Sequence, residues 1–157
     1  MWLWIVAVAI LVVGLVLLLI RKRLRSFGRV VQVEKARELF SLQRSRLEDL
    51  FLKSASASGK PRGLRWTGCT FEVDLALARE RATGELLALV PVTIQFEAIE
   101  GGDMEGVEAV GNLRNASAVF FYQRGHWHTT GRAVFNLNPL EVIEHFKTRY
   151  EKVELTA

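Results

Sequence analysis

The sequence predicts an α+β chain in which an N-terminal transmembrane helix precedes a domain built from helices and an antiparallel sheet. Three observations lead to this prediction. Residues 2–20 contain no charged side chain, and a basic cluster follows them directly. Apolar residues between 31 and 57 recur at the three-to-four spacing of an α-helix. Those between 67 and 137 mostly alternate with polar residues, which is typical of strands.

The apolar run is long enough to cross a bilayer as one helix, at about 1.5 Å per residue. Trp2 and Trp4 suit the interface, where indole rings settle among lipid headgroups. A cleaved signal peptide would carry its positive charge before the run, whereas here the charge follows it. A buried helix in a chain of this size would keep a polar face. Residues 1–20 are therefore predicted to be a transmembrane anchor.

A basic juxtamembrane segment, residues 21–30, follows this anchor. Positive residues beside a span favour the cytoplasmic side. We therefore expect a single-pass protein of the cell membrane with its N-terminus outside and residues 31–157 forming a cytoplasmic domain. The same cations are expected to contact anionic headgroups of the lipid bilayer, at about 1 kcal/mol each. They are Arg21, Lys22, Arg23, Arg25 and Arg29.

The positive net charge of the chain comes from that segment. The chain has 21 basic and 17 acidic residues, a net charge of +4. Five of the basic residues lie in the segment, so the remaining 16 against 17 acidic ones leave −1 on the rest of the chain. A domain with that balance lacks the basic surface that binds nucleic acid. The expected partners are instead the bilayer and either another protein or a second copy of this chain.

Beyond the basic segment, the pattern predicts a helix, four strands and a second helix. The long amphipathic helix, 31–57, stops before Gly59 and Pro61. Short turns join the first strand to the second and the third to the fourth, so each pair is antiparallel. Asn138 is a suitable N-cap and Pro139 a suitable first residue for the closing helix. The predicted strands span 67–79, 86–99, 116–124 and 127–137.

A sheet with one apolar face needs a helical cover, and the long amphipathic helix is predicted to pack on it. At the level of architecture alone, this arrangement is similar to cystatin-like and NTF2-like rolls. Such rolls often enclose a pocket between sheet and helix, although the resemblance carries no function by itself. In such a pocket Trp66, Tyr122 and Arg124 would orient a small ligand; the alternative is that the aromatic residues are plain core.

His126 and His128 are the one pair with metal-ligand character. Alternate residues of a strand point the same way, so both imidazoles would share a face. They would bind zinc if a carboxylate such as Glu72 or Asp74 joined them. The alternative is an ordinary solvated face, because the neighbouring residues on that face are also polar. We therefore predict no metal and no cofactor.

Catalytic patterns are missing from the sequence. Cys69 is the single cysteine, which excludes an intramolecular disulfide and a cysteine-based metal site, and we expect it to be a small core residue. No G-x-S-x-G, H-E-x-x-H or phosphate-binding loop is present. The sequence thus assigns no catalytic residue.

Together these features predict a membrane-anchored, non-enzymatic cytoplasmic interaction or scaffold module. The alternative is a small-molecule-binding or enzymatic α+β roll with a pocket between sheet and helix. A third reading is regulation at a lipid surface through the basic juxtamembrane segment.

Overall fold

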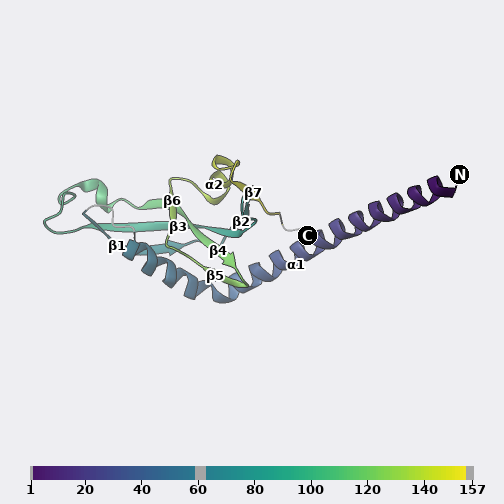
Figure 1. Cartoon of the computed structure of the whole chain (residues 1–157). Helices are drawn as coiled ribbons and strands as arrows, with labels where there is room; N and C mark the ends of the chain where they lie inside the picture. Colours follow the sequence, from purple (N-terminus) through teal and green to yellow (C-terminus); the bar gives the residue numbers. More distant parts are fainter. Residues whose placement is uncertain (1, 59–62, 155–157) are drawn as a thin grey trace. The chain divides into compact units, whose positions relative to one another are not determined.

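The computed structural model of the chain describes residues 2–58 and 63–154, and within residues 2–30 it describes only the side chains at 12 and 14–17. The chain divides into two compact units, one reaching up to residue 35 and one formed by Ala36–Glu154. The second unit holds the sheet, the last part of the first helix and the short second helix. Figure 1 labels the elements. In chain order they are α1 (Trp2–Ser58), β1 (Leu64–Phe71), β2 (Ala76–Glu80), β3 (Leu86–Ala98), the 3₁₀ turn η1 (Glu108–Gly111), β4 (Arg114–Gln123), β5 (His126–His128), β6 (Ala133–Phe135), α2 (Pro139–His145) and β7 (Tyr150–Lys152).

The prediction of a transmembrane helix is wrong. Among the residues that the structure describes, no helix is long and apolar enough to cross a membrane. The apolar run is not a helix of its own, because α1 continues from it through the basic segment to Ser58. The single-pass membrane localisation and the cytoplasmic placement of residues 31–157 rested on that span and are contradicted with it.

The predicted α+β class is present, with a long helix and a large antiparallel sheet, but the sheet has seven strands where four were expected. The central pair is β3 and β4, which are in register from Leu86 opposite Tyr122 to Ile94 opposite Arg114. Both β1 and β2 pair with β3 on its other side, and both β5 and β6 pair with the far side of β4. The count is wrong mainly because two of the predicted strands are each broken into two.

Arg44 holds the break between β1 and β2. Its guanidinium, on α1, donates to the backbone carbonyls of Glu72 and Val73, and its Nε also pairs with Glu48 at 2.8 Å. These hydrogen bonds tie the segment between β1 and β2 to α1. Val73 belonged to the predicted apolar face of this strand, yet 86% of its surface is exposed. Apolar and polar residues therefore alternate through the segment between β1 and β2, although its backbone is not part of the sheet.

A close contact with α1 interrupts the other predicted strand between β5 and β6. Gly131 lies there at a φ of 75°, and a Cβ on it would lie 2.2 Å from the backbone nitrogen of Ala55. Only glycine fits both the backbone conformation and the space. Thr129 fixes the turn, because its hydroxyl donates to the Val119 carbonyl at 2.9 Å and accepts from the Gly131 N–H at 3.1 Å.

Strand β7 was not predicted, because the closing helix that starts at Asn138 was the last element expected. The start of that helix agrees with the prediction, and Asn138 forms a full capping box with Glu141. Helix α2 nevertheless ends at His145, and Tyr150 opens β7 opposite Glu80 of β2. Three residues give no readable alternation, so the pattern could not show this strand.

The two faces of the sheet have different covers, the last part of α1 on one (the α1 face) and α2 on the other (the α2 face), as Figure 1 shows. On the α1 face the Phe40 ring lies 5.2 Å from Phe120 and 5.1 Å from Trp127. The Trp127 Nε1 group donates to the Ala36 carbonyl of α1 at 2.7 Å. Aromatic rings thus fill the space between helix and sheet, burying surface that contributes about 25 cal/mol per Å².

On the α2 face, the cover is partial. Val142 and Ile143 of α2 pack against Leu87 and Leu89, near the start of β3. Further along β3, the residues that point to this face are polar or half-buried. They are Pro91, Thr93, Gln95 and Glu97. One end of the sheet is therefore a two-sided core, and the other end is covered on one side only.

β1 contains an irregularity at Thr67. Trp66 is opposite Phe96, whereas Gly68 is opposite Gln95, so Thr67 is an extra residue without a partner in β3. This bulge reverses the alternation within the strand. It lets Trp66, Cys69 and Phe71 all share the α1 face.

We predict that Gly131→Ala lowers the free energy of unfolding by at least about 2 kcal/mol, because the new methyl group would overlap the backbone of Ala55. Gly125→Ala is the matched control. Gly125 also has a positive φ, of 84°, but nothing lies within 4 Å of the position that a Cβ on it would take. It should lose only the roughly 1 kcal/mol that a left-handed alanine costs. Chemical denaturation measures both values, and equal losses in the two variants would contradict the contact.

We also predict that the attachment of β7 to β2 weakens in acid. Hydrogen bonds from Thr83 and from Arg149, the latter 2.8 Å away, hold the pKa of the Glu80 carboxyl below its usual value of 4.5. Because this pKa is lowered in the folded chain, its stabilising effect is complete above pH 4.5 and is lost as the pH falls through the lowered pKa. Glu80→Gln should remove that dependence and speed hydrogen exchange at the Val153 N–H, which donates to Leu77, by about two- to fivefold.

The control for this prediction is Glu144→Gln, which removes an exposed carboxylate of α2 that pairs with Lys147, just beyond the end of the helix. Exchange at Val153 should be unchanged in that variant. If Glu80→Gln and the unaltered chain show the same exchange at neutral pH, the ion pair does not hold β7.

Candidate functional site

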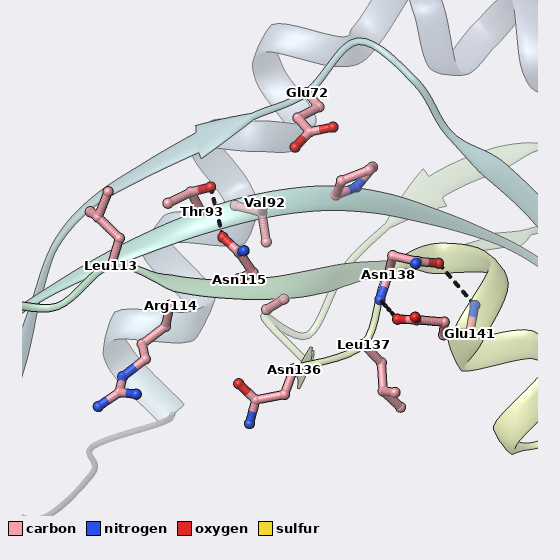
Figure 2. Close-up of a pocket in the computed structure, with 12 residues that line it drawn as sticks. Glu72, Val92, Thr93, Leu113, Arg114, Asn115, Asn136, Leu137, Asn138 and Glu141 are labelled. Carbon is pink, nitrogen blue, oxygen red and sulfur yellow. Dashed lines mark hydrogen bonds between the residues drawn. The ribbon is translucent and has the colours of Figure 1, made fainter.

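The uncovered part of the α2 face contains a groove of about 550 Å³, which we call the sheet groove. It crosses the sheet from the end of β1, over β3 and β4, to the segment between β6 and α2. Figure 2 shows its lining, with Glu72 on one side of the paired strands and Asn136 and Asn138 on the other. The lining residues are Glu72, Pro91, Val92, Thr93, Leu113, Arg114, Asn115, Ala116, Asn136, Leu137, Asn138 and Glu141.

The floor of the sheet groove carries a pair of polar side chains from the two central strands. Thr93 and Asn115 are directly opposite each other in the register, and the Thr93 hydroxyl donates to the Asn115 Oδ1 atom at 3.3 Å. This leaves the NH₂ group of the Asn115 amide to donate elsewhere. The floor therefore offers hydrogen-bond donors and acceptors in a fixed arrangement on rigid strands.

The walls of the sheet groove add charge. Glu141 is engaged in the α2 cap, where its Oε2 accepts from the Asn138 N–H at 2.8 Å (Figure 2). The Glu72 carboxylate, by contrast, makes no hydrogen bond or ion pair with any residue in the described part of the chain, and the same holds for the Asn136 amide. Asn136 has a φ of 61°, a conformation that asparagine tolerates better than other side chains. The groove thus combines two carboxylates and the Arg114 side chain with several amides, and the Glu72 carboxylate gives one wall an unpaired negative charge.

The structure does not bring the predicted pocket residues together in this groove. Trp66 packs against Phe51 and Phe96 on the α1 face, at ring separations of 6.4 and 5.1 Å. Tyr122 lies 5.0 Å from Trp127. Arg124 lies in the turn between β4 and β5 at a φ of 50°. None of the three lines the sheet groove.

The predicted histidine pair does share one face of β5, as strand geometry requires. The His128 ring stacks on Phe121 with centroids 5.5 Å apart, and His126 is exposed. Within residues 2–58 and 63–154, no three histidine, cysteine, aspartate or glutamate side chains are grouped to hold a metal ion. The predicted lipid-contacting side chains of Arg21, Lys22, Arg23, Arg25 and Arg29 lie outside the described side chains.

Sequence reasoning missed Thr93, Asn115 and Asn136. The polar character of Thr93 and its neighbours on the second predicted strand was visible. What could not be read was that Asn115, 22 residues later, lies directly opposite. The positive φ of Asn136 depends on the turn that leads into α2, and no local pattern marks it.

No family model and no curated protein matches the sequence, and no solved structure matches the fold. The expected similarity to cystatin-like and NTF2-like rolls therefore receives no support from a known structure.

We predict that Cys69 reacts slowly with thiol reagents. Burial raises the pKa of its thiol to about 11. At pH 8 roughly one thiol in a thousand would then be ionised, compared with about one in four for a free cysteine. Reaction with a chromogenic disulfide should be more than about 100-fold slower than with free cysteine, and unfolding in guanidinium should remove the difference. A native-state rate close to that of free cysteine would contradict the burial of Cys69.

Proposed function

We propose that the unit formed by Ala36–Glu154 is a non-enzymatic interaction module that binds an extended protein segment in the sheet groove. The observation that carries this proposal is the groove itself, a cavity of about 550 Å³ on the sheet beyond Leu87 and Leu89, where α2 packs. Binding sites occur preferentially in such preformed hollows with a few fixed polar groups.

The polar groups favour a polypeptide as the occupant. An extended chain presents an N–H or a C=O group at every residue, and the Thr93–Asn115 pair supplies matching partners on the groove floor. The Glu72 carboxylate at one wall favours a basic side chain in the partner. We therefore propose a partner segment that is extended and carries lysine or arginine.

The proposal is tested by selecting peptides from a random displayed library against the full 157-residue chain and measuring the affinity of the selected peptides by fluorescence anisotropy. Asn115→Ala and Glu72→Gln remove one floor group and one wall charge. Each should weaken binding by about 5- to 30-fold, the usual effect of a lost polar contact in an interface. Basic residues should be enriched among the selected sequences.

Glu38→Gln is the matched control, because Glu38 is an exposed carboxylate on α1, outside the groove. It should leave the affinity within about twofold of the unaltered chain. Peptides that bind all four proteins equally, or a selection that yields no saturable binder, would refute the sheet groove as the binding site.

A further inference from the structure

A second cavity lies on the opposite, α1 face of the sheet, at the end of β3 that is remote from α2. It has a volume of about 300 Å³, and we call it the loop pocket because the loop between β3 and β4 forms one side of it. Met104, Ala109 and Val110 come from that loop, while Leu64, Phe96 and Phe135 come from β1, β3 and β6. Its walls are therefore mostly apolar.

The strand side of the loop pocket is aromatic. The Phe96 and Phe135 rings lie 6.3 Å apart, and both contact Trp66, at 5.1 and 6.4 Å. The Phe135 side chain is apolar, yet 40% of its surface is exposed. An aromatic ring held by two others but open on one side offers apolar surface that a ligand would cover.

Arg114 places a positive charge at the rim of this apolar space. It is opposite Ile94 in the register, so its side chain starts on the α1 face, and its Nη2 atom donates to the Ala109 carbonyl at 3.3 Å. That bond uses one of the five guanidinium N–H groups. Across residues 2–58 and 63–154, no carboxylate lies within ion-pair distance of Arg114.

We propose that the loop pocket binds a small monocarboxylate with an apolar body. The body would lie against Phe96 and Phe135, and the carboxylate would take the free N–H groups of Arg114. The volume is at the lower end of the range for ligand pockets, which excludes a long chain or a large polycyclic ligand. Neutral ligands would leave the guanidinium unpaired, so the charge selects an acid.

The loop pocket and the sheet groove lie on opposite faces of the sheet. Different side chains are proposed to bind the ligand in each. Arg114 and Asn136 line both cavities, but the groove is tested with Asn115 and Glu72, which do not line the loop pocket. Loss of one activity without the other is therefore measurable, and the failure of either proposal leaves the other standing.

The test is isothermal titration of the full 157-residue chain with 3-phenylpropionate and with its uncharged amide, 3-phenylpropionamide. The acid should bind saturably with one site, and the amide at least about tenfold more weakly, because it lacks the charge-assisted contact. Arg114→Met keeps the length of the stem but removes the charge. It should reduce the affinity for the acid by at least about tenfold and abolish the preference for acid over amide.

Arg124→Met is the matched control, since Arg124 lies in the turn between β4 and β5 and does not line the loop pocket. It should bind the acid as the unaltered chain does. Phe135→Ser is a second variant at a partly exposed position, and it should weaken acid and amide equally by removing apolar contact. No saturable binding of the acid, equal binding of acid and amide, or full acid affinity in Arg114→Met would each overturn the proposal.

Discussion

The two central strands are covered on both faces at one end and on only one face at the other, and the rest of the structure follows from this asymmetry. On the face that α1 covers, the row of side chains from Leu86 to Phe96 is buried along its whole length. The seven-residue helix α2 reaches only Leu87 and Leu89 on the opposite face. A strand covered on both sides must be apolar throughout, whereas one covered on a single side can alternate. The sequence of β3 changes from the first type to the second at Pro91.

The same asymmetry explains why the polar groups of the sheet groove can exist at all. Burying an unpaired amide or hydroxyl within a two-sided core costs several kcal/mol. Thr93 and Asn115 avoid this cost because their face is open to water, and they satisfy part of their bonding requirement with each other. Neighbouring residues of one strand point to opposite faces. Asn115 accordingly lines only the sheet groove, whereas Arg114, one position before it, also reaches the loop pocket.

Features with local causes could be predicted from the sequence, and features with distant causes could not. The start of α2 was predictable because Asn138, Pro139 and Glu141 are within four residues of one another. The break between β1 and β2 and the break between β5 and β6 could not be predicted. They depend on contacts of Arg44 and Ala55 with segments many residues away. The membrane-spanning helix was inferred from composition alone, and the structure contradicts it.

For the candidate sites, too, contacts between distant segments could not be predicted from the sequence. The polar face of the second predicted strand was recognisable, but its partner across the sheet was not, since register is a property of two segments. The predicted pocket between sheet and helix stays a prediction; the rings of Phe40, Phe51 and Phe120 pack against one another there. Aromatic side chains at strand spacing are equally consistent with a cavity lining and with a filled core, so the sequence alone could not decide between them.

The bulge at Thr67 affects the tendency of the protein to aggregate at high concentration. β1 is a border strand, bonded in the described chain to β3 alone. A straight border strand presents an even ladder of free peptide groups on which another strand can add, and repeated addition leads to fibrils. The extra residue shifts the spacing of that ladder midway along β1, so a regular strand would match only part of it. A single inserted threonine therefore disfavours edge-to-edge addition of one sheet to another, and with it aggregation.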